Sequence, residues 1–172
     1  MSNNITTLYI KKTATASELK STQKDFGFAV VSATWAEETV EDLISREWPG
    51  EHGEDTYIPQ TGLRILAYDI EIGLCYKGKL DTANAKYREL RTYLLGLNGD
   101  GAELIIYDPY LKKGRQKVYV KSISDITHNK TDLDEALSIK VTFRVTDPIT
   151  EVIAVTNAKQ EITNLAPDEL AN

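Results

Sequence analysis

The stretch REWPGEHGEDTYIPQ, residues 46–60, leads into LRILAYDIEIGLCY, residues 63–76, and the two together decide the fold. In the second segment, apolar side chains occupy alternate positions from residue 66 to residue 76. Successive side chains of a β-strand point to opposite faces, so this spacing predicts a long strand with one buried face. The first segment contains Gly50 and Gly53 and predicts a corner of the chain before that strand.

Strand patterns recur on both sides of this segment. The clearest is residues 137–145, where apolar and polar residues alternate, so that one face belongs to the core and the other faces water or a partner. Pro148 ends this pattern, because proline has no N–H to donate to a neighbouring strand. The remaining predicted strands cover residues 5–10, 26–33, 102–107, 116–123 and 151–155.

Residues 81–97, DTANAKYRELRTYLLGL, have the periodicity of an α-helix. Their apolar side chains recur at steps of three and four and form one stripe, which continues as far as Leu97. Asp81 is predicted to be the N-cap, and Asn98 with Gly99 tolerates the left-handed conformation at the end of the helix. One helix among many strands indicates an α+β domain: a mainly antiparallel β-sandwich or barrel-like sheet with one packed α-helix.

The polar segments set the expected limits of this domain. Residues 1–155 are expected to form one β domain, and residues 156–172, which are polar and weakly patterned, a flexible C-terminal tail. Residues 11–24 predict an exposed N-terminal arm or loop, whose deletion should leave the monomer folded but abolish assembly with other copies. Residues 35–48 allow either a short helix or a long acidic loop, and a loop with a helical turn is favoured.

The composition narrows the class of protein. The chain has 172 residues, 27% of them charged, and a formal net charge of −6, which is ordinary for a globular protein. An acidic chain does not suit a protein that grips phosphates, because such proteins need clustered Lys and Arg. The N-terminus lacks the pattern of a secretory signal, so folding in a cytoplasm is expected, and Cys75 alone cannot form an internal disulfide.

Two histidines lie among acidic residues. His52 has three acidic neighbours, but their spacing matches no ligand pattern that fixes a metal geometry, so a solvated acidic loop is favoured. His128 precedes Asp132 and Asp134, whose spacing is faintly similar to a calcium loop without its central glycine and final glutamate. A polar loop between strands is the simpler interpretation there.

Signatures of catalysis are also missing from the sequence. Neither histidine lies near a serine or cysteine in a recognisable arrangement, and Cys75 has no activating neighbour. Glycines at 96, 99 and 101 follow a helix and precede a strand, which is the reverse of a phosphate-binding loop. We therefore predict no catalytic, cofactor-binding or metal-binding residues, and a protein that is not an enzyme.

Three large aromatic residues lie in the acidic region before the long strand: Trp35, Trp48 and Tyr57. They either pad the core beneath a long loop or face a partner, since Trp and Tyr are enriched at interfaces. The sequence favours padding and leaves the second interpretation open.

The order of these features resembles the N-terminal, ring-forming domain of the distal tail proteins of long-tailed bacteriophages, which share the tail-tube fold. The resemblance spans roughly residues 5–155 and rests on element order and on short motifs. Two departures are the long, acidic segment 35–48 and the absence of a second, carbohydrate-binding-like domain after the β domain. The motifs are Phe26-Gly27-Phe28, PGEHGED at residues 49–55, the strand ending at Tyr76, YREL at residues 87–90, Tyr107-Asp108-Pro109 and VTFRVTDP at residues 141–148.

The resemblance implies a virion structural protein of a phage or prophage tail. Members assemble as hexameric rings around a channel for DNA, which passes without sequence-specific binding, and they contact tape-measure, tube and hub proteins. It implies location in the virion tail, and in the bacterial host cytoplasm during assembly, with no cofactor and no membrane partner. The expected assembly interface consists of Trp48, Pro49, Gly50, Gly53 and Tyr57.

Two other classes stay open at this point. A non-viral, monomeric adaptor or ligand-binding module would have the same sheet and helix, and a concave aromatic-lined pocket. A hydrolase using the acidic loops would depend on His52 or His128.

Overall fold

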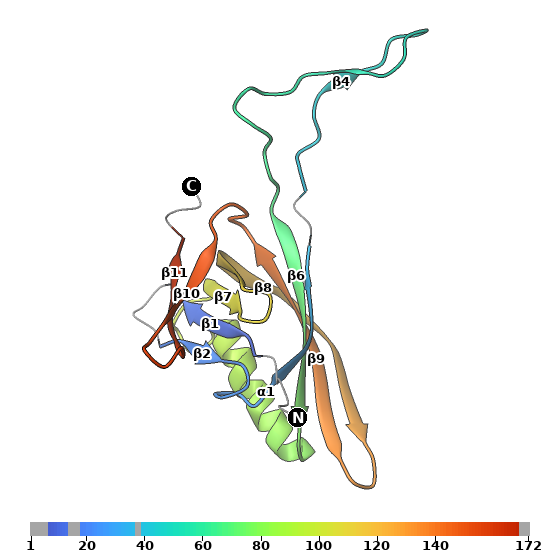
Figure 1. Ribbon diagram of the computed structural model, residues 1–172. Helices are drawn as coiled ribbons and strands as arrows, with labels where there is room; N and C mark the ends of the chain where they lie inside the picture. Colours follow the sequence, from blue (N-terminus) through green and yellow to red (C-terminus); the bar gives the residue numbers. More distant parts are fainter. Residues whose placement is uncertain (1–6, 14–17, 37–38, 169–172) are drawn as a thin grey trace.

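The computed structural model describes residues 7–13, 18–36 and 39–168 (Figure 1). Its main element is a seven-stranded sheet in the order β2-β1-β7-β8-β9-β6-β3, in which every neighbouring pair is antiparallel. Two further hairpins, β4–β5 and β10–β11, lie outside this sheet. The strands are β1 Tyr9–Lys12, β2 Lys20–Ser21, β3 Ala29–Trp35, β4 Ser45–Arg46, β5 Asp55–Thr56, β6 Tyr68–Lys77, β7 Leu104–Asp108, β8 Lys113–Lys130, β9 Glu135–Val145, β10 Val152–Thr156 and β11 Ile162–Pro167.

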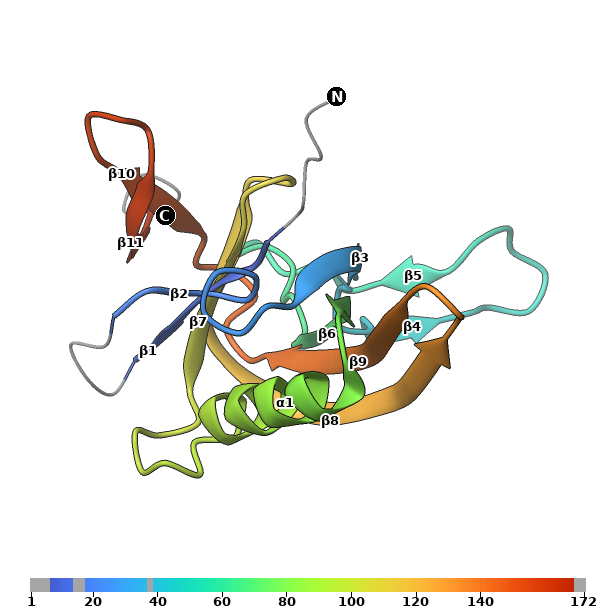
Figure 2. The same ribbon diagram turned by 90° about the horizontal axis from the view of Figure 1, so that it is seen from below.

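The helix α1, Leu80–Leu94, packs against the sheet and contacts β9 and β8 (Figure 2). It is the only helix in the ranges that the structure describes. The predicted α+β fold, a mostly antiparallel, sandwich-like sheet with one packed helix, is therefore confirmed.

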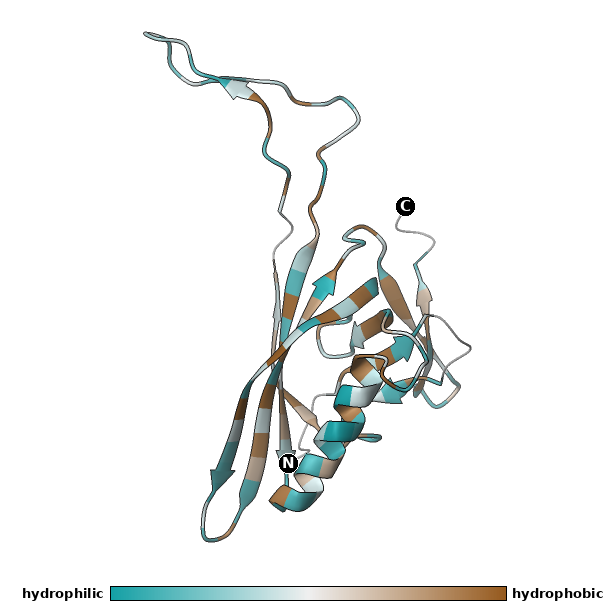
Figure 3. Ribbon diagram, turned by 180° about the vertical axis from the view of Figure 1, so that it is seen from behind, coloured by the Kyte–Doolittle hydropathy of each residue, from teal (hydrophilic) through white to brown (hydrophobic). Residues whose placement is uncertain are grey.

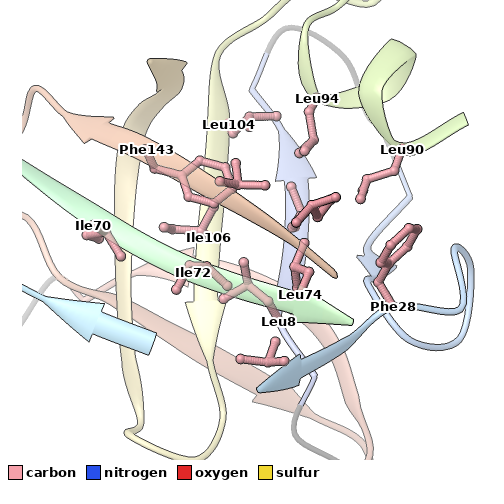
Figure 4. Packing of buried hydrophobic residues seen from close by; sticks show 14 of the residues in the cluster. Leu8, Phe28, Ile70, Ile72, Leu74, Leu90, Leu94, Leu104, Ile106 and Phe143 are labelled. Carbon is pink, nitrogen blue, oxygen red and sulfur yellow. The ribbon is translucent and has the colours of Figure 1, made fainter. Parts of the chain in front are cut away.

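The two strands with the clearest alternation form the centre of the core. In β9 every second side chain from Leu137 to Val145 is at most 3% exposed, and β6 pairs with it along its whole length. A fully buried side chain such as Phe143 or Ile72 stabilises the fold by about 1.5–3 kcal/mol, because it leaves water. Figure 4 shows inward-pointing side chains from the sheet and α1 packed together: Leu8, Phe28, Ile70, Ile72, Leu74, Leu90, Leu94, Leu104, Ile106 and Phe143.

The helix differs from its prediction at both ends. It begins at Leu80, and its N-cap residue is Lys79 rather than Asp81, which lies in the first turn. It ends at Leu94, and Leu97, predicted to continue the buried stripe, is 61% exposed. Gly96 has a φ of +67°, and an added Cβ there would lie 2.3 Å from the carbonyl oxygen of Gly101, so the chain reverses earlier than expected.

The prediction of an exposed N-terminal arm or loop over residues 11–24 is wrong for Lys12 and for residues 20–22, whereas Thr13, Glu18 and Lys24 are exposed outside the strands. Lys12 belongs to β1 and is 1% exposed, and β2 pairs with β1. Thr22 is completely buried, and its hydroxyl accepts a hydrogen bond from the N–H of Leu8. Residues 14–17 lie outside the described ranges, as do residues 5 and 6 of the predicted first strand, and Thr7 and Leu8 precede β1, which begins at Tyr9.

The segment expected to be a flexible tail contains a strand. β11 pairs with β10, and the hairpin packs on the body because Val152 and Leu165 form a small core with Tyr107. Apolar residues at wide spacing, such as Ile162 and Leu165, therefore suffice for a strand once a partner strand is in place. The structure corrects the predicted tail over Ile162–Pro167, whereas residues 169–172 lie outside the described ranges.

Candidate functional site

The chain between β3 and β6 leaves the body as a long two-legged hairpin, named here the hairpin arm and defined as residues 39–67 (Figure 1). Its legs pair through a bridge between Val40 and Ile65 near the body and through β4 and β5 near the tip. The residues from 39 onward are extended, so the helical turn predicted for residues 35–48 is wrong there. Three further backbone hydrogen bonds join the legs: Leu66 N–H to Thr39 O, Glu41 N–H to Arg64 O and Tyr57 N–H to Ile44 O.

The tip of the hairpin arm has a defined local structure. The Arg46 guanidinium lies 3.9 Å from the centre of the Trp48 ring, a cation–π contact. The indole Nε1–H of Trp48 donates a hydrogen bond of 2.9 Å to the Asp55 carboxylate, which lies across the β4–β5 pair. Beyond this pair the chain turns through Gly50 and Gly53, whose φ angles of +87° and +88° suit glycine. The side chain of Trp48 is therefore held in place at the tip.

All five residues predicted to form an assembly interface lie at this tip and are exposed: Trp48, Pro49, Gly50, Gly53 and Tyr57. Trp48 is 42% and Tyr57 72% exposed, so the prediction that they pad the core is wrong for both. Of the three aromatic residues, only Trp35 pads the core as predicted, since it is half-buried against the main core. The predicted corner at residues 46–60 is thus the end of a projecting hairpin.

Apolar side chains along the legs were not recognised as exposed from the sequence. Leu66, expected on the buried face of the long strand, is 37% exposed, because that strand begins only at Tyr68. Figure 3 shows apolar and polar positions interspersed along both legs. The exposed large apolar residues of the hairpin arm are Val40, Ile44, Trp48, Tyr57, Ile58, Leu63 and Leu66.

The acidic character of the chain is concentrated in the same region. Residues 39–67 contain six acidic and two basic residues, so the hairpin arm carries −4 of the chain's formal charge of −6. The rest of the sequence carries −2. The hairpin arm is therefore both the most apolar exposed element and the most acidic one.

The polar face of the central sheet carries paired charges. Asp69 on β6 accepts hydrogen bonds from Lys121 on β8 and from Arg144 on β9, and these two donors lower the pKa of its carboxyl. Glu71 pairs with Lys140 across a distance of 2.6 Å, which raises the pKa of that lysine. Each of these three cations therefore already has a carboxylate partner.

The other residues singled out from the sequence form no common site. His52 is exposed at the tip of the hairpin arm, and His128 lies on β8 with its Nε2 atom 4.0 Å from Glu135 Oε2. Asp132 and Asp134 lie in the turn between β8 and β9, and Cys75 is half-buried on β6. Within the described ranges, no three His, Cys, Asp or Glu side chains are grouped to hold a metal ion.

No protein-family model matches this chain, and the search of curated proteins found no match. In the described part of the chain, no helix has the length and apolar character needed to cross a membrane.

Proposed function

We propose that this chain is a structural subunit of a phage or prophage tail that forms a hexameric ring around the DNA channel, near the tail tip or in the tube. The observation that carries the proposal is the hairpin arm, which projects from the body with seven large apolar side chains exposed. Seven large apolar side chains exposed on one projecting element favour a protein–protein contact, because leaving them in water is unfavourable. The family resemblance of the sequence supplies the kind of assembly.

The shape of the hairpin arm favours contact between unlike surfaces. It leaves the body at the start of β6 and points away from it (Figure 1), so its tip meets a different part of the neighbouring molecule. Such head-to-tail contacts close into rings when the rotation between copies fits, and otherwise continue as stacks. Both results suit a tail, in which rings are stacked along a channel.

The paired charges on the sheet support a passage for DNA that does not hold it. Lys121, Lys140 and Arg144 are occupied by Asp69 or Glu71 and cannot release counterions from phosphate without losing those partners. A channel lined by this face would let DNA slide. The further partners proposed are tape-measure, tube and hub proteins, with the virion tail and the host cytoplasm during assembly as the locations.

The test is negative-stain electron microscopy of the purified protein at high concentration, together with its mass in solution. Six-fold rings with a DNA-wide hole are the expected result. Trp48→Ala combined with Tyr57→Ala should abolish the rings, whereas Leu133→Ala, which truncates an apolar residue that is 94% exposed on another turn, should not. A chain that stays monomeric at every concentration contradicts the proposal.

A specific observation favours the alternative, a non-viral monomeric adaptor or ligand-binding module. The body contains an open recess of about 520 Å³ lined in part by Phe26 and Tyr93, within the size range of small-molecule sites. A monomer that binds a small aromatic or acidic ligand there would replace the ring proposal.

A further inference from the structure

The recess lies between the second half of α1 and the turn that follows β2. Phe26 and Tyr93 line it with rings whose centres are 5.5 Å apart. Two cations share the recess, Lys20 from β2 and Arg88 from α1. The Lys20 ammonium lies 5.1 Å from the centre of the Tyr93 ring and 5.7 Å from that of Phe26, so charge and aromatic surface are adjacent.

These two cations lack acidic partners. Neither Lys20 nor Arg88 forms an ion pair or hydrogen bond through its side chain with any residue that the structure describes. Of the two carboxylates that line the recess, Glu89 pairs with Lys86, whereas Asp25 accepts the neutral N–H of Ser21 and keeps its charge. Lys20 and Arg88 together exceed Asp25 by one positive charge, so the net charge left in the recess is positive.

A buried hydroxyl points to the same conclusion. Tyr93 is only 6% exposed, and its hydroxyl has no hydrogen-bond partner within the described ranges. Buried polar groups of folded proteins nearly always have a partner, so a partner from outside the described residues is expected for this hydroxyl, as it is for the similarly unpaired indole N–H of Trp35. An incoming carboxylate would find Lys20 and Arg88 beside it as ion-pair partners.

The tip of the hairpin arm has the complementary chemistry. Trp48 presents an exposed indole face, and the neighbouring carboxylates of Glu47 and Glu51 are exposed and form no ion pair with a described residue. The tip cannot supply its own recess as the structure stands, because no residue of the hairpin arm lines it. We propose that the tip of one copy seats in the recess of a second copy, with Trp48 against Phe26 and Tyr93.

In this arrangement Glu47 and Glu51 face Lys20 and Arg88. The proposal rests on the assembly proposed above and names the surface that receives the hairpin arm. The hairpin arm leaves the body at the start of β6, whereas α1 begins just after the end of β6, so donor and receiver are different surfaces. The contact therefore repeats from copy to copy in one direction.

Charge exchange in the full-length chain tests the contact. Arg88→Glu should weaken self-association by about tenfold or more, and Glu51→Lys should do the same, because each places like charges together. The double variant carrying both changes should recover most of the association. Arg91→Glu, on the same exposed side of α1 but outside the recess, and Asp42→Lys, on the leg of the hairpin arm, are the matched controls. Sedimentation velocity measures all five.

A second measurement fixes the position directly. In a Cys75→Ser background, chains with Glu51→Cys are mixed with chains with Arg88→Cys and treated with a short bis-maleimide. Mass spectrometry should find the peptide containing residue 51 of one chain linked to the peptide containing residue 88 of the other. Tyr93→Phe should weaken association without loss of the folded monomer.

The outcomes separate the two proposals. Rings that form equally well with Arg88→Glu and Arg91→Glu, and that give no link between residues 51 and 88, overturn the recess as receiver and leave the ring subunit standing. A chain that never associates overturns both. Recovery by the double variant, together with the link, supports both.

Discussion

The Oε2 atom of Glu135 lies 2.9 Å from the backbone nitrogen of Leu80, so that a side chain of β9 caps the N-terminus of α1. The helix's own N-cap residue, Lys79, makes no side-chain capping hydrogen bond. Because β6, which precedes the helix, pairs with β9, the cap is fixed by the sheet. The start of the helix thus depends on a residue 55 positions away.

Glu135→Ala is therefore expected to lower the thermal midpoint by a few degrees, since the N–H of Leu80 loses its acceptor. The Leu80 N–H and Lys130 lower the pKa of Glu135. Its contribution to stability is accordingly present above the ordinary pKa of 4.5 and is lost as the pH falls through the lowered value. Thermal melts followed by circular dichroism at pH 7 and pH 3 measure this. Equal midpoints for wild type and variant at pH 7 would contradict the cap.

Asp69→Asn is expected to create affinity for DNA. It frees Lys121 and Arg144 on the polar face of the sheet, so binding to duplex DNA should strengthen and its logarithmic salt slope should steepen by roughly 1–2. Asp81→Asn makes the same change of net charge on the exposed first turn of α1 and serves as the control. Equal affinities of the two variants, measured by fluorescence anisotropy at several salt concentrations, would show that the pairing does not mask the cations.

Burial together with Asp25 and Asp100 raises the pKa of Tyr93 to about 12. A raised pKa means that the folded state favours the neutral phenol, so stability is full below pH 10 and falls as the pH rises from 10 towards 12. The loss approaches about 3 kcal/mol at the upper end. Urea unfolding between pH 8 and pH 12 should show this loss in wild type and a smaller one in Tyr93→Phe. Tyr110→Phe, at an exposed tyrosine, is the control, and equal losses in all three chains would be evidence against this assignment.

Deletion of residues 11–24 is now expected to unfold the subunit. The deletion removes the buried side chains of Lys12 and Thr22. It also removes β2 and with it the pairing of β1 with β2. In contrast, replacing residues 39–66 by a short turn should leave the body folded, because the β3–β6 pairing still extends to Trp35 and Ile70. Far-UV circular dichroism and urea unfolding distinguish the two variants. A cooperative transition in the first would restore the sequence-based expectation.

The central strands could be predicted because burial on one face leaves a strict period of two. β9 shows it without exception from Leu137 to Val145, and β6 from Tyr68 to Leu74. The helix could also be predicted, from the spacing of its apolar residues. Its first residue could not, because the cap comes from Glu135 and not from Asp81. Local pattern thus predicts an element, and tertiary contact decides its ends.

The exposed apolar residues could not be recognised in the same way. Leu66 has the same parity as Tyr68 and Ile70, yet the partner strands stop where the body ends, so the same pattern continues without a core beneath it. The recess is likewise invisible in the sequence, because Lys20 and Arg88 are brought together only by the packing of α1 beside β2. Burial of Lys12 also follows from its place on β1 and contradicts its chemical type.

The acidic hairpin arm has a consequence for the subunit before it assembles. Free copies expose large apolar side chains such as Ile44, Tyr57 and Ile58 on the hairpin arm, and this exposure by itself would favour aggregation. Since that element carries −4 of the chain's formal charge of −6, two such elements repel each other more strongly than either repels the remainder of the molecule, which carries −2. This repulsion therefore disfavours contact between the hairpin arms of two free subunits. Contact between the hairpin arm of one subunit and the body of another is opposed less strongly.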